Sequence, residues 1–208
     1  MWLMRAPSID PERKWLAFAA GYIVFSLLYV LTGRFHLRTP SPAPALPVDS
    51  LIPFVGWTVW IYHSQFLFLL TSARMVKTKA GISRTLYSMG LASALSFCVF
   101  LLYPTTLPRP LIQPEGLTAE AFNFLYSVDS TSNCVPSLHV ALACLGARGM
   151  AEAGARVGAL AIGWAALISV STMTTKQHYF ADVLAGVCIA AVSNALTKRW
   201  LGASGSAA

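Results

Sequence analysis

The sequence predicts an all-α membrane protein, a single bundle of about six transmembrane helices that takes in residues 1–208. The 208 residues are 56% hydrophobic and 11% charged, and the mean hydropathy is +0.60. Because soluble domains carry about 25% charged residues, this composition excludes an ordinary soluble fold. Long apolar runs separated by short polar segments indicate helices that cross a bilayer. The lipid bilayer is therefore the expected partner of the chain.

Apolar segments of near-spanning length set the number of predicted helices. A helix needs about 20 residues to cross about 30 Å of hydrocarbon. Most of the segments approach this length, whereas the fourth and fifth are shorter, and we expect their ends to extend into the flanking loops. In chain order the segments are residues 15–31, 51–70, 86–102, 135–150, 157–170 and 179–196.

The positions of Lys and Arg orient the predicted bundle, because cytoplasmic loops carry an excess of positive charge. Eleven of the 15 Lys and Arg residues fall on the side that holds both termini, and the other four fall on the opposite side. We therefore expect a multi-pass cell-membrane protein with both termini in the cytoplasm. The net charge of +7 is explained by this orientation and by anionic lipid headgroups, so nucleic acid is not an expected partner. The cations of the opposite, outer side are Arg34, Arg38, Arg109 and Lys176.

The first part of the chain provides a leader, a span and a linker. Residues 1–14 form a charged leader that we expect in the cytoplasm. The apolar run that follows is too long for a cleaved signal peptide, which predicts an uncleaved first span. Residues 40–47, with the sequence PSPAPALP, predict a stiff extended linker across the outer surface.

Polar residues in the second span favour a structural role. His63, Ser64 and Gln65 lie in the middle of this span, where polar groups face the bundle interior and form hydrogen bonds across helices. The third span carries only small polar residues and is interpreted as scaffold.

The connection formed by residues 103–134 is the longest polar segment and is predicted on the outer face. Three prolines, at positions 104, 108 and 110, prevent a helix at its start. Arg109 lies within this rigid stretch and is a planar donor suited to bidentate phosphate binding. Contact with lipid headgroups explains an arginine in this loop equally well. Residues 117–126 mix apolar and polar side chains, which predicts a segment lying along the membrane interface.

The stretch Asn-Cys-Val-Pro-Ser-Leu-His at residues 133–139 opens the fourth span. We expect Pro136 at the first helical position, followed by Ser137 and His139. Free backbone N–H groups and the positive end of the helix dipole then make this terminus an anion site. It lies on the same predicted side as Arg109 and His178.

Residues 171–182, with the sequence STMTTKQHYFAD, predict a short polar connection between two buried helices. His178 and Asp182 are four residues apart, so on a helix they share one face. The carboxylate can then fix the imidazole tautomer and leave the other ring nitrogen free as a nucleophile or base. A capping pair at the start of a helix is the structural alternative.

These segments together resemble the type-2 phosphatidic acid phosphatase superfamily. The family pattern has three blocks, namely Lys-x6-Arg-Pro, Pro-Ser-Gly-His and Ser-Arg-x5-His-x3-Asp. The order, spacing and predicted membrane side of the blocks agree with this chain over about residues 103–186. The matching residues are Arg109-Pro110, Pro136-Ser137-Leu138-His139, and Ser171 with His178 and Asp182.

Departures from the family pattern concern its cations. The lysine of the first block falls at Leu102 and the arginine of the third block at Thr172. The glycine of the second block is Leu138. Lys176 is the nearby replacement cation on the outer face. This variant is similar to the branch that includes inositol phosphorylceramide synthase-like proteins, which transfer a phosphoryl headgroup.

The resemblance implies a catalytic role for each matched residue. His178 would attack phosphorus and form a phosphohistidine, with Asp182 holding its ring, and His139 would act as general acid and then base. It also implies that neither a metal nor another cofactor is needed. The expected reaction is hydrolysis of a lipid phosphate monoester or pyrophosphate at the outer face, and headgroup transfer at the same site is the alternative. The expected phosphate-binding residues are Arg109, Ser137 and Lys176.

Two further classes of protein remain as alternatives. Polar residues within spans could mark the path of a lipid or ion carrier, although His63 is the one ionisable residue clearly placed in mid-span. Alternatively, His63, His139 and His178 could ligate haem, in which case the purified protein would be coloured. The four cysteines, at positions 98, 134, 144 and 188, show no CxxC spacing and are interpreted as core residues.

Overall fold

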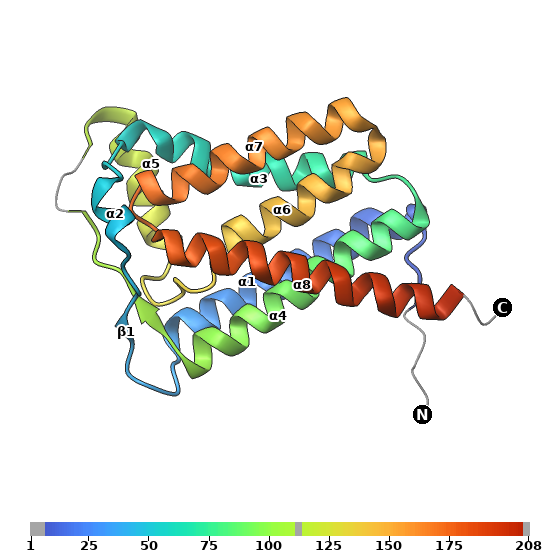
Figure 1. Ribbon diagram of the computed structural model, residues 1–208, viewed down its shortest axis with the longest axis horizontal. Coiled ribbons are helices and arrows are strands. Elements are labelled where there is room, and N and C mark those ends of the chain that lie inside the picture. Colours follow the sequence, from blue (N-terminus) through green and yellow to red (C-terminus); the bar gives the residue numbers. More distant parts are fainter. Residues whose placement is uncertain (1–6, 111–113, 206–208) are drawn as a thin grey trace.

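The computed structural model describes residues 7–110 and 114–205, with side chains as far as residue 202. Its helices form an elongated bundle, as the sequence predicts, and two short strands lie at one end (Figure 1). The helices are α1 (Lys14–Arg34), α2 (Pro47–Leu51), α3 (Val59–Met75), α4 (Lys79–Leu102), α5 (Gly116–Val128), α6 (Leu138–Met150), α7 (Ala155–Thr174) and α8 (Phe180–Gly205). Short 3-10 turns are η1 (Pro11–Arg13), η2 (Gly56–Thr58) and η3 (Ala151–Ala153), and the strands are β1 (Ser41–Pro42) and β2 (Thr105–Thr106).

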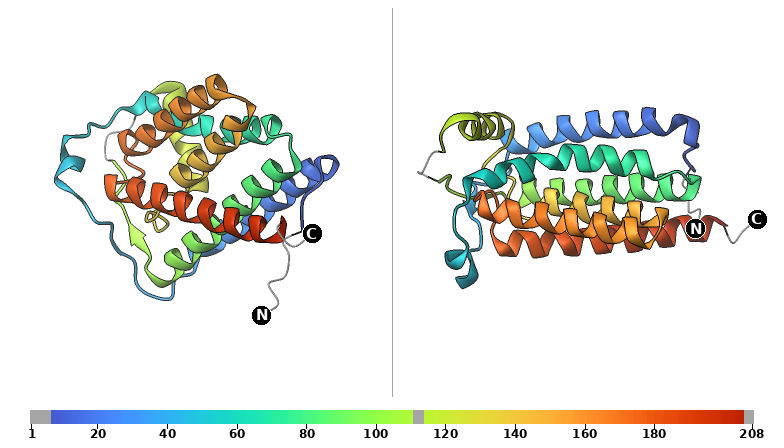
Figure 2. Two further views of the ribbon diagram at one scale, coloured as in Figure 1. Left: turned by 45° about the vertical axis from the view of Figure 1, so that its right-hand side comes forward. Right: turned by 90° about the horizontal axis from the view of Figure 1, so that it is seen from above.

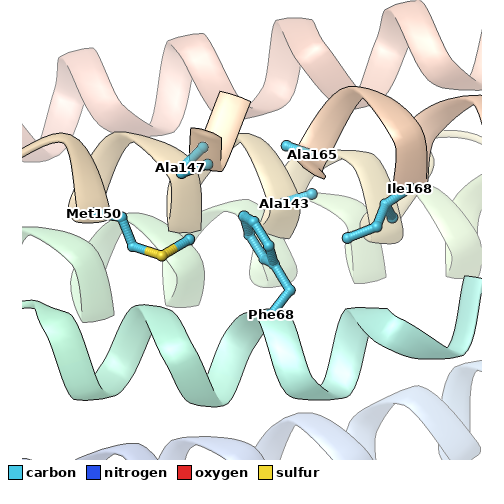
Figure 3. Close-up of a cluster of buried hydrophobic side chains, with 7 residues drawn as sticks. Phe68, Ala143, Ala147, Met150, Ala165 and Ile168 are labelled. Carbon is cyan, nitrogen blue, oxygen red and sulfur yellow. The ribbon is translucent and has the colours of Figure 1, made fainter. Parts of the chain in front are cut away.

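Helix α6 is the centre of the bundle and contacts α3, α4, α7 and α8. Small residues allow this close packing, because they let helix backbones approach one another. A Cβ added at Gly146 would lie 2.8 Å from the Phe68 ring. That ring points from α3 into a cluster with Ala143 of α6 and Ile168 of α7 (Figure 3). The apolar core therefore forms around one short, enclosed helix.

Among the described residues, four helices are long and apolar enough to span a membrane. Helices α3, with 17 residues, and α6, with 13 residues, are shorter than the about 20 residues that a straight span needs. Because α6 is surrounded by protein, the hydrocarbon thickness does not set its length. The prediction of an all-α membrane protein is confirmed, whereas the count of six spans stays a prediction. The four candidate spans are Pro11–Arg34, Lys79–Leu102, Ala155–Thr174 and Phe180–Gly202.

Large apolar side chains cover the outside of these helices. On α1, Leu16 is 72% exposed and Leu27 is 67% exposed, and on α7 Leu160 is 69% exposed. Soluble proteins rarely leave apolar patches of this extent in water. The surface is that of a bundle whose outer faces contact lipid chains.

The two ends of the bundle differ in composition. The start of α1 and the end of α8 lie at one end, opposite the end that carries α2 and α5 (Figures 1 and 2). The first end also holds charged contacts, including the ion pairs Lys79–Asp10 at 2.7 Å and Arg148–Glu152 at 2.8 Å. The basic connections that the sequence assigns to one side thus gather at one end of the fold.

Several predicted helix boundaries are wrong. The second apolar segment was expected to be helical from residue 51, but α3 begins at Val59, because Pro53 interrupts a helix there. Helix α6 begins at Leu138 instead of residue 135, and Pro136 lies before its N-cap residue, Ser137. The linker 40–47 is extended only as far as residue 46, since α2 begins at Pro47.

The polar connection 171–182 is shorter than predicted, because α7 continues to Thr174 and α8 begins at Phe180. The hydroxyl groups of Ser171 and Thr172 donate to backbone carbonyls of the preceding turn, which satisfies them within an apolar helix. In the segment 103–134, the start is extended as predicted and α5 covers the stretch 117–126. Residues 111–113 of that segment, and residues 1–6 of the predicted leader, lie outside the described residues.

Candidate active site

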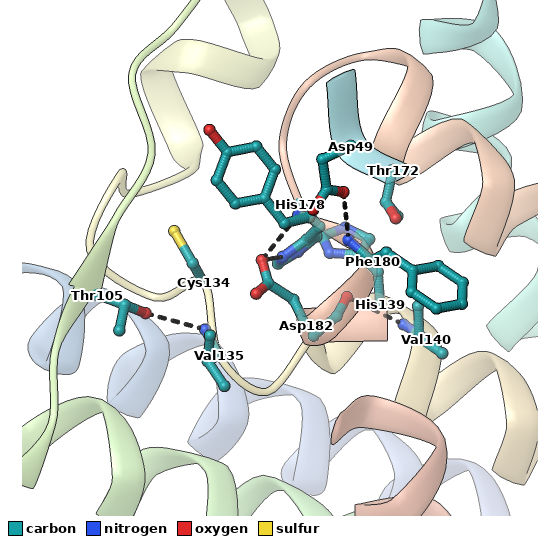
Figure 4. Close-up of polar contacts among 12 residues, drawn as sticks. Asp49, Thr105, Cys134, Val135, His139, Val140, Thr172, His178, Phe180 and Asp182 are labelled. Carbon is teal, nitrogen blue, oxygen red and sulfur yellow. Dashed lines mark hydrogen bonds and ion pairs between the residues drawn. The ribbon is translucent and has the colours of Figure 1, made fainter. Parts of the chain in front are cut away.

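Three chain segments meet at the end of the bundle that carries α2 and α5. Strand β1 pairs in parallel with β2, and Thr105 of β2 forms a further bridge with Asn133. The Thr105 hydroxyl also accepts the backbone N–H of Val135 at 3.1 Å (Figure 4). These contacts hold the segment before α6 against the segment that carries Arg109. The turn between α7 and α8 completes the group.

His178 and Asp182 lie in direct contact, as their spacing predicts. The Nδ1 atom of His178 lies 3.2 Å from Oδ2 of Asp182, and the two side chains are 6% and 0% exposed (Figure 4). The same Oδ2 accepts the backbone N–H of Tyr179 at 3.0 Å. Asp182 thus pairs with the imidazole and also braces the turn. With its Nδ1–H donated to the carboxylate, His178 keeps a free lone pair on Nε2.

Backbone contacts place His178 just before the N-terminus of α8. The N–H groups of Gln177 and His178 both donate to the Thr172 carbonyl, at 2.9 and 3.0 Å. Lys176 has φ 58°, the left-handed conformation that is uncommon for a residue other than glycine. This reversal turns the chain from the end of α7 toward α8.

Asp49 supports the same turn from a distant segment, and sequence reasoning missed it. Its Oδ1 atom accepts the backbone N–H of Phe180 at 2.7 Å (Figure 4). Its Oδ2 atom accepts the backbone N–H of Leu46 at 2.8 Å. A carboxylate at the first residue of α8 also stabilises the positive end of the helix dipole. The available signal was an acidic residue within a stretch otherwise read only as a linker and the start of a span.

His139 lies in the first turn of α6 and faces His178. The two imidazole rings have centroids 6.2 Å apart. Nδ1 of His139 lies 3.3 Å from the hydroxyl oxygen of Tyr62, which donates to Oδ2 of Asp129 at 2.7 Å. Tyr62 and Asp129 are further residues that the sequence analysis did not single out. The two predicted catalytic histidines therefore share one site.

Ser137 caps the start of α6, and its expected contact with phosphate stays a prediction. Its side chain is wholly buried, and Oγ accepts the N–H of Val140 at 3.5 Å as the N-cap of α6. Its own N–H donates to the Asp182 carbonyl at 3.0 Å. A Cβ added at Gly186 would lie 2.5 Å from the Ser137 carbonyl oxygen, so only glycine allows this approach of α8. Ser137 therefore joins the segment that carries His139 to the segment that carries Asp182, and its hydroxyl oxygen caps α6.

Arg109, Lys176 and His178 line one small pocket, together with Asp129, Asn133 and Cys134. Nη2 of Arg109 donates to the backbone carbonyls of Tyr126 and Asp129, at 3.2 and 3.0 Å. Its guanidinium carbon lies 4.1 Å from the centroid of the Tyr126 ring, and Nε has no hydrogen-bond partner in the described part of the chain. The Nζ atom of Lys176 donates to the Ile52 carbonyl. The expected cations therefore meet beside the predicted nucleophile.

The positions where the chain departs from the family pattern have clear environments. Leu102 is 59% exposed at the end of α4, and Thr172 is fully buried beneath the His178 turn. Leu138, in place of the second-block glycine, packs with Phe97 and Phe100. The side chain at this position thus makes an apolar contact between α4 and α6.

The remaining histidine and cysteine predictions concern structure. His63 binds the Ala121 carbonyl through Nε2 at 3.0 Å, which joins α3 to α5 and agrees with a structural role. All four cysteines are free thiols, but Cys98 and Cys188 are exposed, so the interpretation of all four as core residues is wrong. Cys134 lines the pocket, and burial raises its pKa to about 12, so its thiol stays protonated at neutral pH.

Comparisons with known proteins identify the family. The family model described as PAP2 superfamily matches residues 28–196, a region that includes every residue of the pocket. A comparison with curated proteins gives no significant match. The family model covers most of the chain, and the apolar helices are those of a membrane protein. Phosphatase or phosphotransferase activity is usual in this superfamily, and the chain belongs to the PAP2 superfamily.

Proposed function

We propose that the protein is an integral membrane phosphatase that hydrolyses a lipid phosphate monoester or pyrophosphate through a phosphohistidine. The observation that carries this proposal is the contact between His178 and Asp182 at the edge of a pocket shared with Arg109 and Lys176. His139 lies across from His178, close enough to serve the same substrate. A nucleophile, its orienting carboxylate, a second histidine and two cations are the parts that phosphoryl transfer needs.

In the first step His178 attacks the phosphorus atom. The Nε2 lone pair forms the N–P bond as the P–O bond to the leaving group breaks. The electron pair of that bond stays on the leaving oxygen, which takes a proton from the protonated His139. Asp182 stabilises the positive charge that develops on the His178 ring. The products of this step are the lipid alcohol, or the shortened lipid phosphate, and a phosphohistidine.

In the second step water releases the phosphate. The water oxygen attacks phosphorus while the N–P bond breaks and its electron pair returns to His178. His139, now neutral, takes a proton from the attacking water. Free phosphate leaves, and both histidines regain their starting states. No step in this sequence requires a metal ion.

Arg109 and Lys176 neutralise the charge that spreads over the phosphate oxygens in the transition state. In other enzymes one such donor contributes about 2.7–4 kcal/mol, or 10²–10³ in rate. The Nε atom of Arg109 is buried and has no partner among the residues that the structure describes, which leaves one donor of this guanidinium unpaired beside the pocket. Ser137 contributes indirectly, because it caps α6 and holds the Asp182 backbone.

The same chemistry would perform headgroup transfer if a lipid alcohol replaced water in the second step. This second candidate rests on Leu138 and Thr172, which stand where the hydrolytic pattern has glycine and arginine, as in the synthase-like branch. The charge distribution supports a site on the outer face of the cell membrane, with both termini in the cytoplasm.

A panel of lipid phosphates tests both candidates at once. Phosphatidate, phosphatidylglycerophosphate, a polyprenyl pyrophosphate and a headgroup-bearing phosphodiester are each supplied in mixed micelles. Free phosphate and new lipid products are measured in parallel. Phosphate release that disappears in His178→Ala supports the hydrolase, and a new phosphodiester lipid supports the transferase. If neither product forms with any lipid, the proposed function is wrong.

A further inference from the structure

We propose that Tyr62 and Asp129 form a positioning pair that fixes the tautomer of His139 and stabilises its protonated form. This inference rests on the proposed function, because it assigns His139 its proton donor atom. His139 would then have its own carboxylate, Asp129, which is connected to the imidazole through the Tyr62 hydroxyl.

Direct contacts connect the three side chains in sequence. Nδ1 of His139 lies 3.3 Å from the Tyr62 hydroxyl oxygen, and the ring centroids of these residues are 4.3 Å apart. The Tyr62 hydroxyl lies 2.7 Å from Oδ2 of Asp129. Tyr29 of α1 donates its hydroxyl to Oδ1 of the same carboxylate. Each carboxylate oxygen of Asp129 therefore accepts a hydrogen bond from a tyrosine hydroxyl.

Hydrogen-bond direction follows from the chemistry of these groups. An ionised carboxylate only accepts, so Tyr62 must donate its proton to Asp129. The Tyr62 oxygen then has lone pairs to accept a hydrogen, and the Nδ1–H of His139 is the donor in reach. This fixes Nδ1 as the protonated nitrogen in the neutral ring. The proton that cycles during catalysis is accordingly on Nε2.

The position of the Asp129 carboxylate argues for a functional role. Asp129 lines the same pocket as Arg109 and Lys176, where a negative charge repels the phosphate of a substrate. Arg109 also donates to the Asp129 backbone carbonyl at 3.0 Å, so the residue lies firmly beside the phosphate-binding cation. Perturbing charges of this kind gather at functional sites. Stabilising a protonated His139 offsets that repulsion.

Other titratable groups surround His139 and must be considered in any measurement of its proton. The His178 ring lies 6.2 Å from the His139 ring between centroids, and the His63 ring lies 5.8 Å from the Tyr62 ring in an edge-to-face arrangement. Tyr62 and Asp129 face the ring nitrogen directly or through the phenol, and Tyr29 faces Asp129. Of these, Tyr62 is the residue in hydrogen-bond contact with Nδ1.

The pair predicts a dependence on the leaving group. A general acid contributes about 10²–10⁴ in rate when the leaving oxygen needs a proton. An alkoxide leaving group needs that proton, whereas a nitrophenolate does not. Loss of Tyr62 should therefore slow an alkyl phosphate far more than a nitrophenyl phosphate. A purely structural role would slow both substrates equally.

The kinetic experiment uses the full-length protein in detergent and two substrates. One is an alkyl phosphate, and the other is a nitrophenyl phosphate whose ring carries the same alkyl chain. The quantity measured is kcat/KM, which reports phosphorylation of the enzyme and not the release of phosphate. We expect Tyr62→Phe and Asp129→Asn to lose at least about tenfold on the alkyl phosphate and less than about threefold on the aryl phosphate. The matched control is Tyr87→Phe, because that hydroxyl binds the Pro7 carbonyl at the other end of the bundle. Equal losses on both substrates would overturn the positioning role.

A second measurement does not depend on turnover. Nitrogen-15 NMR of the neutral imidazoles, with His139 assigned by its absence in His139→Gln, reports which ring nitrogen carries hydrogen. We expect Nδ1–H in the wild-type protein and loss of that preference in Tyr62→Phe. An Nε2–H tautomer of His139 in the wild type overturns the inference. If instead the NMR result holds while lipid phosphates are not turned over, the pair stands and the proposed function fails.

Discussion

The two histidines of the site are supported in different ways. His178 contacts a carboxylate four residues later in the chain, within one turn of α8. His139 reaches its carboxylate through Tyr62 of α3, and Asp129 follows α5. One support is local and direct, whereas the other joins distant segments through an intervening phenol. The difference teaches that local helix geometry brings the proposed nucleophile to its carboxylate, whereas the packing of distant helices brings the proposed acid–base histidine to its own.

Removing either ring should give the largest effect. His178→Ala should reduce lipid phosphate turnover to background, a loss on the order of 10⁶-fold, because we assign the covalent intermediate to this ring alone. His36→Ala is the control, since that histidine lies in the connection after α1 and has no place in the mechanism. Turnover near wild type in His178→Ala would contradict the assignment of the nucleophile.

The two carboxylates should differ in the size of their contribution. Asp182→Asn removes the acceptor that contacts His178 and should cost about 10⁴ in kcat, as loss of a direct orienting carboxylate does in another enzyme. Asp129→Asn acts through a phenol and should cost less than Asp182→Asn on the same alkyl phosphate. Rates measured side by side, with folding checked by gel filtration, decide the order. A larger loss for Asp129→Asn would reverse the comparison.

The pocket cations lie beside His178 and should contribute next. Lys176→Ala should lose on the order of 10²-fold in kcat/KM, because with Leu102 and Thr172 in place of cations fewer groups share the phosphate charge. Lys79→Ala at the opposite end is the matched control, since its partner is Asp10. A loss of only a fewfold that changes with salt would instead indicate that Lys176 contacts lipid headgroups.

The support of His178 from outside its own helix should appear as stability. Asp49→Ala removes the acceptor for the Phe180 N–H and should destabilise the fold by about 0.5–2 kcal/mol, the usual cost of losing a helix cap. The measurement is the thermal midpoint in detergent, with and without vanadate, which mimics five-coordinate phosphorus. Ser50→Ala is the control, because its hydroxyl binds a carbonyl within α2. An unchanged midpoint would show that Asp49 is not needed for this turn.

Metal removal should have the smallest effect on the rate, and a large effect would contradict the view that each histidine has its own support. If each histidine has its own carboxylate, EDTA should leave the rate unchanged, and vanadate should inhibit. A shared metal held by His139, His178 and Asp182 would instead make activity depend on a divalent ion. Inactivation by EDTA that a divalent ion reverses would therefore show that the two histidines share a metal ion, and that they do not depend on separate carboxylates.

The same contrast explains how much the sequence could predict. The contact between His178 and Asp182 follows from four-residue spacing, which local helix geometry converts into proximity. Apolar runs predict the helices, but not their first residues, because Pro53 and the cap at Ser137 shift the starts of α3 and α6. Tyr62 gives no such signal, since a tyrosine in an apolar helix is an ordinary core residue. Its role depends on the packing of α3 against α6, which spacing does not encode.

The role of Asp49 also depends on a contact between distant segments, and this contact has a consequence for biosynthesis. Asp49 binds a backbone group 131 residues later in the chain, whereas Tyr62, Asp129 and His139 are all made before α7 and α8. At about 5–20 residues per second, the α2 segment waits on the order of 10 s for Phe180 after it is synthesised. During that interval Tyr62, Asp129 and His139 can come together before His178, the proposed nucleophile, has been synthesised. The newly made chain therefore acquires its reactive histidine last, when its final helix joins the bundle.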